Sequence, residues 1–165
     1  MKRGEHHGAL REALIKAALA LLDAQGGEAV TIRAVARAAQ VSHAAPANHF
    51  ADRRALWTGI AIDCFETLLT DLARARSAGG SPRARIDAAI EAYLAYAIRH
   101  PHRYRLMWRL DMLDREDARL TSLIDRLYAD LEQDVQALGP MVSGRTTTIV
   151  IALGSVIHGY ASMRI

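Results

Sequence analysis

The sequence predicts an all-α fold, in which an N-terminal three-helix domain with a helix-turn-helix precedes a C-terminal antiparallel helical bundle. Apolar residues recur at helical spacing along most of the chain, and no strand-like alternation persists. The 165 residues include only four prolines, and the abundant Ala, Leu and Arg favour helices. With 51% hydrophobic and 24% charged residues, the composition is that of a globular protein and excludes wholesale disorder.

Capping and breaking signals divide the N-terminal part into short helices. Thr31 is the predicted N-cap of a second helix, Ser42 that of a short segment ending at His49, and Asp52 that of a long helix. Gly26 and Gly27 supply the stop of the first helix. The apolar positions of that first helix are Leu10, Leu14, Ala17, Ala18, Leu21 and Leu22.

The rest of the chain predicts four further helices. Ser81 and Pro82 follow two glycines and mark the start of a helix that runs to about residue 99. A shorter helix follows His100-Pro101, and the last two are expected over residues 116–138 and 143–164. We predict two domains, residues 1–55 and 56–165.

The second and third helices have the composition that a helix-turn-helix needs. Small residues on the second helix let the next one pack closely, and Val41 fills the junction. These small residues are Ala34, Ala36, Ala38 and Ala39. Such a pair places one helix in the major groove of DNA. The alternative is a helical protein-interaction module in which the same pair serves packing only.

Positive charge is concentrated in the first third of the chain. Residues 1–60 hold eight Lys or Arg and five Asp or Glu, whereas residues 61–165 hold thirteen of each. This asymmetry is expected if the N-terminal part meets a polyanion, although a chance fluctuation would explain so small a difference.

Residues 10–56 resemble the DNA-binding domain of TetR/AcrR-type transcriptional regulators. The matching segments are Thr31-Ile32-Arg33-Ala34-Val35-Ala36, Ala39-Gln40-Val41-Ser42, Ser42-His43-Ala44-Ala45-Pro46 and His49-Phe50-Ala51-Asp52-Arg53. Residues 100–107 and 157–162 are similar to the subgroup whose ligand-binding half is named for a Trp-His-Gly motif.

The resemblance implies a homodimeric repressor that binds a palindromic operator in double-stranded DNA and is released by a small-molecule effector. It places the DNA-binding residues at Thr31, Arg33, Ser42, His43, Ala44, Asn48, His49 and Arg53. The family's last two helices usually form a four-helix dimer interface, whereas this chain stops at Ile165, so whether the dimer forms without a further helix stays open.

Three residues depart from the family pattern. Gln40 stands where a glycine is usual, and the turn there often needs a left-handed conformation that costs other residues about 1 kcal/mol or more. Ala47 replaces an aromatic residue that reaches a phosphate. Arg54 replaces an acidic residue, so we expect DNA binding to rely more on Arg53 and Arg54.

Aromatic and sulfur-containing side chains of the C-terminal part could surround an effector. The candidates are Phe65, Tyr93, Tyr96, Tyr104, Met107, Trp108 and His158. Residues of this kind at helical spacing also form ordinary cores, and His158 has the alternative of a core histidine bonded to a neighbour.

Several classes of function are not expected. Cys64 is the only cysteine, so no internal disulfide forms and a reducing compartment is expected. His100 and His102 lack converging ligands for a metal, no cofactor is predicted, and no enzymatic motif occurs. The apolar segment 149–163 contains His158 and is shorter than the roughly 20 residues that span a bilayer. We therefore expect a cytoplasmic regulator that is not an enzyme and meets no membrane.

Overall fold

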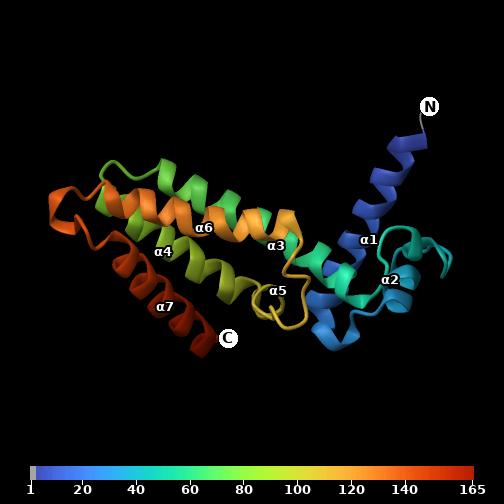
Figure 1. Ribbon diagram of the computed structural model, residues 1–165. Coiled ribbons are helices and arrows are strands. Elements are labelled where there is room, and N and C mark those ends of the chain that lie inside the picture. Colours follow the sequence, from blue (N-terminus) through green and yellow to red (C-terminus); the bar gives the residue numbers. More distant parts are fainter. Residues whose placement is uncertain (1–2) are drawn as a thin grey trace. The chain divides into compact units, whose positions relative to one another are not determined.

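The computed structural model describes the backbone of residues 3–165 and the side chains of residues 8–165, and over these residues it is helical without strands. The α-helices are α1 (Arg3–Gln25), α2 (Ile32–Ala38), α3 (Arg53–Ser77), α4 (Pro82–Arg99), α5 (Pro101–Met107), α6 (Ala118–Gln136) and α7 (Thr146–Arg164) (Figure 1). Three 3-10 turns accompany them, η1 (Gly27–Ala29), η2 (Ala45–Asn48) and η3 (Pro140–Val142). The predicted all-α fold is confirmed.

The chain forms two compact units. Unit 1 contains residues up to Cys64 together with His102–Asp117, and unit 2 contains Phe65–Pro101 and Ala118–Ile165. The predicted N-terminal domain, residues 1–55, lies within unit 1, apart from residues 1 and 2, which fall outside the described residues.

Unit 1 has its own core, to which α1, α2, α3, α5 and the loop after α5 all contribute. Its buried side chains include Leu14, Leu22, Val30, Val35, Phe50, Leu56, Trp57, Ile60, Met107 and Leu113. The predicted caps of α2 and α3 are confirmed, because Thr31 Oγ1 accepts from Ala34 N at 3.2 Å and Asp52 Oδ1 from Ala55 N at 2.8 Å. Burial and capping together fix where these helices begin.

In unit 2, α4, α6 and α7 pack against one another. The predicted cap of α4 is confirmed by Ser81 Oγ, which accepts from Ala84 N at 3.2 Å, with Pro82 in the first turn. A cluster near the η3 end of these helices holds Ile86, Val135, Val142 and Val150. The last two helices, α6 and α7, are two or three residues shorter at their starts than the sequence predicted.

Helix α7 corrects one expectation from the sequence. The helix has 19 residues, and an 18-residue stretch of it has a mean hydropathy of 1.2, so it is long and apolar enough to cross a membrane by length and composition. The apolar segment expected from the sequence was 149–163, whereas the helix extends beyond it at both ends. One such helix is weak evidence for a membrane, and 11% of this stretch is buried in the protein.

The end of α2 is a Schellman motif, with Gln40 in the left-handed region at φ 56°. Gln40 N donates to Arg37 O at 3.1 Å, and Val41 N donates to Ala36 O at 3.0 Å. These two bonds satisfy the last carbonyls of the helix and require a left-handed residue just after it. The sequence-based expectation of a left-handed turn at Gln40 is confirmed.

Replacing Gln40 by glycine should therefore stabilise the protein by about 0.5–1 kcal/mol, because glycine adopts this conformation without the side-chain clash. Thermal unfolding followed by circular dichroism would measure the effect. The matched control is Ala39→Gly, one residue earlier, where φ is −79° and glycine should instead destabilise by a similar amount. Equal shifts in both variants would contradict the argument.

The segment after this turn is not the α-helix that the sequence predicted. Residues Ala45–Asn48 form one 3-10 turn, whose N-cap is Ala44 rather than Ser42 and has no side-chain cap hydrogen bond. Pro46 explains the difference, since it lacks the N–H that would continue an α-helix and disfavours helical backbone at the residue before it. Ser42 contributes its carbonyl instead, which accepts from Ala45 N at 3.0 Å.

Candidate nucleic-acid interface

Most of the residues predicted to meet DNA lie at the surface of unit 1. The exposed ones are Thr31, Arg33, Ser42, His43, Ala44 and Asn48, whereas His49 and Arg53 are half-buried. They come from the start of α2, from the turn after it, from the end of η2 and the residue that follows it, and from the start of α3. The segment therefore presents hydroxyl, imidazole, amide and guanidinium groups, all of which hydrogen-bond to phosphates or base edges.

Arg37 was missed by the sequence analysis. It is exposed on α2, four residues after Arg33, so both side chains lie on one face of the helix. The i, i+4 spacing of two arginines next to the turn is a signal that could have identified it. The pair gives this face of α2 two positive charges.

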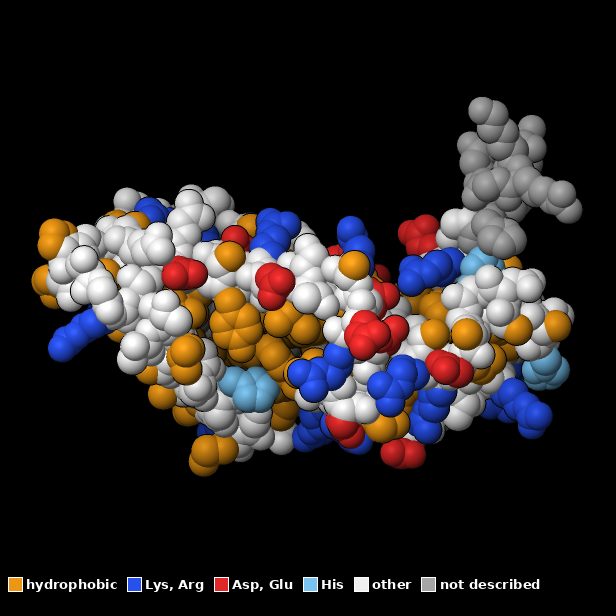
Figure 2. Space-filling model, viewed as in Figure 1, with side chains coloured by type: hydrophobic (Ala, Val, Ile, Leu, Met, Phe, Trp, Pro, Cys, Tyr) orange, Lys and Arg blue, Asp and Glu red, His pale blue; other side chains and the backbone are white. Residues whose placement is uncertain are grey.

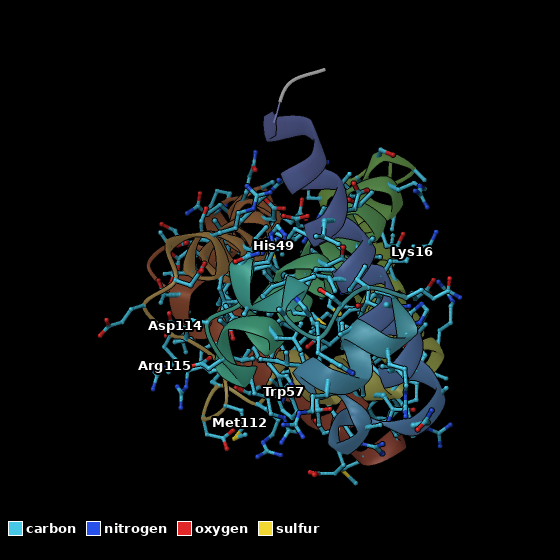
Figure 3. The ribbon with its side chains drawn as sticks, turned by 90° about the vertical axis from the view of Figure 1, so that its right-hand side faces the viewer. Lys16, His49, Trp57, Met112, Asp114 and Arg115 are labelled. Carbon is cyan, nitrogen blue, oxygen red and sulfur yellow. The ribbon has the colours of Figure 1, made fainter. Side chains whose placement is uncertain are left out.

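Arg53 is held by contacts within unit 1. Its Nη2 donates to Gly27 O at 3.2 Å, and its guanidinium carbon lies 4.6 Å from the centre of the Trp57 ring. Trp57, labelled in Figure 3, is buried and donates from Nε1 to Val30 O at 3.2 Å. Arg53 thus links the start of α3 to the connection between α1 and α2, and its predicted proximity to a phosphate stays a prediction.

The predicted effector-contacting residues are divided between the two units. Tyr104, Met107 and Trp108 belong to unit 1, where the Tyr104 and Trp108 rings lie 6.5 Å apart. Phe65, Tyr93, Tyr96 and His158 belong to unit 2. Phe65, Tyr96, Tyr104 and Met107 are almost fully buried, as expected of core residues.

Two of the unit 2 candidates are brought together from different helices. Tyr93 on α4 is buried, and its hydroxyl lies 3.4 Å from Nδ1 of His158 on α7. Burial lowers the pKa of His158 below its ordinary value of 6.5, because the charged imidazolium loses hydration. A cavity of about 300 Å³ lies elsewhere, at the turn between α6 and α7, and is lined by Gln136, Gly139, Pro140, Val142, Ser143, Gly144 and Thr146.

The His158 environment predicts a pH dependence of stability. Because the folded-state pKa is lowered, the unfolded chain takes up the proton first, and stability is lost as the pH falls from 6.5 through the folded-state value. His158→Gln should flatten this part of the pH profile, measured by urea unfolding at successive pH values. The same change at exposed His43 is the matched control, and identical profiles for both variants would contradict the prediction.

Two family models match different parts of the chain. Residues 14–58 match the model described as bacterial regulatory proteins of the tetR family. Residues 86–165 match the model described as the C-terminal domain of tetracyclin repressor-like proteins. The two matches are consecutive and belong to the same family.

Two curated relatives are similar over part of their length. An uncharacterized HTH-type transcriptional regulator, Rv0681 of Mycobacterium tuberculosis, is 31% identical over 105 residues, covering 62% of this chain and 46% of that protein. The nucleoid occlusion factor SlmA of a Marinomonas species is 27% identical over 130 residues, covering 76% of this chain and 66% of that protein. The chain thus matches about half to two thirds of the length of these relatives.

Solved structures show the same fold. A protein of unknown function from Rhodococcus sp. RHA1 is 30% identical, with a TM-score of 0.81, over 98% of this chain and 86% of that one. A possible TetR family transcriptional regulator from Streptomyces coelicolor A3(2) is 19% identical, with a TM-score of 0.71, over 92% of this chain and 69% of that one. Regulators of this kind are DNA-binding proteins rather than enzymes. The helix-turn-helix, the helical second unit and both family matches together show that the chain belongs to the TetR family of bacterial transcriptional regulators.

Proposed function

We propose that the protein is a repressor that binds a palindromic operator as a homodimer and is released from DNA by a small-molecule effector. The observation that carries the proposal is the segment 31–48, which contains α2, makes the left-handed turn at Gln40, continues into η2 and exposes most of the residues predicted to meet DNA. In a helix-turn-helix the part after the turn enters the major groove, and the helix before the turn crosses the DNA backbone. Family membership supports the same assignment.

Thr31 and Arg33 would position the protein on the DNA backbone, and His43 and Asn48 would read base edges. A hydroxyl that accepts the capping bond of α2 still has its own proton to donate, so Thr31 can donate to a phosphate oxygen while capping. Asparagine pairs well with adenine in the major groove. Residue types and exposure both support these roles.

Helix α7 supports the homodimer. Its exposed apolar side chains are Ile151, Val156, Tyr160 and Met163, of which Met163 is 87% exposed. Figure 2 shows hydrophobic side chains gathered along α7 and on the face between α6 and α7. Exposed apolar surface of this extent on one helix is typical of an interface between chains, and a second copy would cover it by symmetry.

The effector would bind within unit 2, among α4, α6 and α7. The contact between Tyr93 and His158 supports a site within unit 2, because it places two hydrogen-bonding side chains among apolar ones on α4 and α7. Binding sites between the helices of bundles commonly combine an apolar lining with few polar groups.

Fluorescence anisotropy would test DNA binding directly. The probe is a labelled duplex from the region beside the protein's own gene, titrated next to a scrambled duplex of equal length at two salt concentrations. A repressor should bind the native duplex more tightly, and its affinity should fall with salt. Failure to bind either duplex at low salt would favour the alternative of a helical interaction module.

Arg33→Ala should weaken binding to both duplexes about equally and reduce the slope of log affinity against log salt by about one, because a phosphate contact carries charge but no sequence information. Arg99→Ala, an exposed arginine in unit 2, should leave both quantities unchanged. A loss confined to the native duplex would instead identify Arg33 as a base-reading residue.

A further inference from the structure

The 3-10 turn η2 carries little that could bind a phosphate. It consists of Ala45, Pro46, Ala47 and Asn48, so it offers one hydrogen-bonding side chain and no charge. A four-residue 3-10 turn is about 8 Å long, whereas the major groove is about 12 Å wide. Most hydrogen bonds between proteins and DNA go to the phosphates and sugars that border the groove. The positive charges that meet these phosphates must therefore come from elements beside η2.

The arginines that the structure describes before α3 are exposed and have no carboxylate partner among the described residues. They are Arg11 on α1 and Arg33 and Arg37 on α2. The arginines of α3, α4 and α6 differ, since six of them form ion pairs with Asp or Glu. These six are Arg74, Arg76, Arg83, Arg85, Arg119 and Arg126. A guanidinium without a carboxylate partner keeps its charge for an external anion such as a phosphate.

Arg11 lies beside the end of η2. Its guanidinium carbon is 5.5 Å from the centre of the Phe50 ring, a distance at which a cation and an aromatic face attract each other. Phe50 is 2% exposed, and its N–H donates to Pro46 O at 2.8 Å, so its position is fixed relative to η2. No described oxygen accepts a hydrogen bond from the Arg11 guanidinium, whose N–H groups therefore remain for a phosphate.

Gly59 leaves the space in which Arg11 lies. A Cβ placed on Gly59, in α3, would be 3.3 Å from Arg11 Nη2 and 3.1 Å from both Phe50 Cε1 and Ile15 Cδ1. These distances are shorter than ordinary contacts between side chains, so a larger residue would displace the guanidinium or the ring. Glycine is otherwise one of the least favourable residues inside a helix. Its presence at this position keeps Arg11 against α3 and next to Phe50.

We infer that Arg11 binds a DNA phosphate beside the end of η2, from a helix outside the helix-turn-helix, and that Gly59 is the positioning residue that keeps it there. This inference rests on the proposed function. Arg33 and Arg37 precede the turn, whereas Arg11 adjoins the residue that follows His49, so positive charge comes from elements next to both ends of the segment that enters the groove. Because the phosphate is the same in every sequence, Arg11 adds affinity for any duplex.

Anisotropy titrations of the full chain with the native and the scrambled duplex, each at several salt concentrations, test the inference. Arg11→Met should weaken binding to both duplexes about tenfold at about 0.1 M salt and reduce the slope of log affinity against log salt by about one. Arg11→Lys keeps the positive charge and should keep the slope of the wild type. A reduced slope in both variants would overturn the role of the charge.

Lys16→Met is the matched control, because it removes one positive charge from an exposed residue of the same helix. Lys16 is five residues further along α1, on a different face of the helix, and Figure 3 shows it well away from His49. This variant should bind both duplexes as the wild type does. Equal losses in Arg11→Met and Lys16→Met would overturn the inference, since they would reflect the net charge alone.

Gly59→Ala tests the positioning role, with circular dichroism to establish that the variant is folded. It should weaken binding to both duplexes at least threefold, because the guanidinium is displaced while the charge remains. Combined with Arg11→Met, it should cause no further loss, since both changes act on the same contact. A further loss in the double variant would overturn the positioning by Gly59.

The behaviour of the wild type separates this inference from the proposed function. Undiminished binding by Arg11→Met, beside a wild type that prefers the native duplex, would overturn the inference and leave the proposed function intact. A wild type that binds neither duplex at low salt would overturn the proposed function and the inference with it.

Discussion

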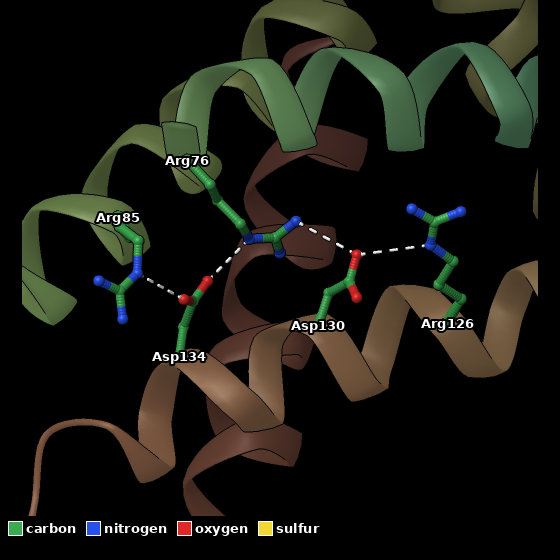
Figure 4. A network of polar contacts seen from close by, with 5 residues as sticks. All are labelled: Arg76, Arg85, Arg126, Asp130 and Asp134. Atoms are coloured by element: carbon green, nitrogen blue, oxygen red, sulfur yellow. Dashed lines mark hydrogen bonds and ion pairs between the residues drawn. The ribbon is translucent and has the colours of Figure 1, made fainter. Parts of the chain in front are cut away.

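Replacing Asp134 by alanine is expected to lower the free energy of unfolding by about 3 kcal/mol. Asp134 on α6 is 5% exposed. Its carboxylate accepts from Arg76 Nε at 2.7 Å and from Arg85 Nε at 3.0 Å (Figure 4). One side chain thereby joins α3, α4 and α6 in unit 2, so its removal affects the packing of three helices.

The expected loss comes mainly from the arginines that remain. The Arg76 side chain is 13% exposed and would keep only Asp130, whose Oδ2 lies 3.6 Å from Nη1. A buried charge deprived of its partner cannot recover its hydration, which is why breaking such a pair costs about 3–5 kcal/mol. The Arg85 side chain is 31% exposed and can turn to water, so we expect the lower end of this range.

Urea unfolding followed by circular dichroism would measure the change. The matched control is Asp87→Ala, which removes the exposed pair between Asp87 and Arg83 on α4 and should cost only about 0.3–0.5 kcal/mol. Similar losses in the two variants would show that Asp134 behaves as a surface residue, contrary to its burial.

The features that the sequence predicted correctly are local ones. Thr31, Asp52 and Ser81 cap helices because a side-chain oxygen reaches a backbone N–H three residues later, and this depends on few other residues. The left-handed backbone at Gln40 is likewise determined by how one short helix ends. The all-α fold followed from many such signals acting in the same direction.

The features that the sequence could not supply depend on partners far away in the chain. Asp134 lies 58 residues from Arg76 and 49 from Arg85, and nothing in the polar stretch around it marks it as buried. Arg54 finds its carbonyl partners 57 and 59 residues away. Pro46 is different, because its effect on the third helix is local and could be predicted from the sequence. The prediction of a helix there instead followed the family pattern, in which this segment is a regular helix.

Val156→Glu is expected to abolish the proposed homodimer and to lower the affinity for its proposed operator by two to four orders of magnitude. Val156 is 70% exposed on α7, between Ile151 and Met163, which are 60% and 87% exposed. In a dimer that covers this face, a carboxylate would lose its hydration without gaining a partner, so the chains would separate. A separated chain binds one half-site only and loses the gain that comes from joining two binding events.

Analytical ultracentrifugation would give the oligomeric state, and anisotropy with the native duplex would give the affinity. Ile98→Glu is the matched control, because Ile98 is an exposed apolar residue, 55% accessible, on α4 rather than α7. We expect that variant to stay dimeric and to bind as the wild type does. A dimeric Val156→Glu would place the interface away from α7, and a monomer with undiminished affinity would show that one chain suffices to hold the operator. Because the two measurements are independent, they separate the question of where the chains meet from the question of whether DNA binding needs both.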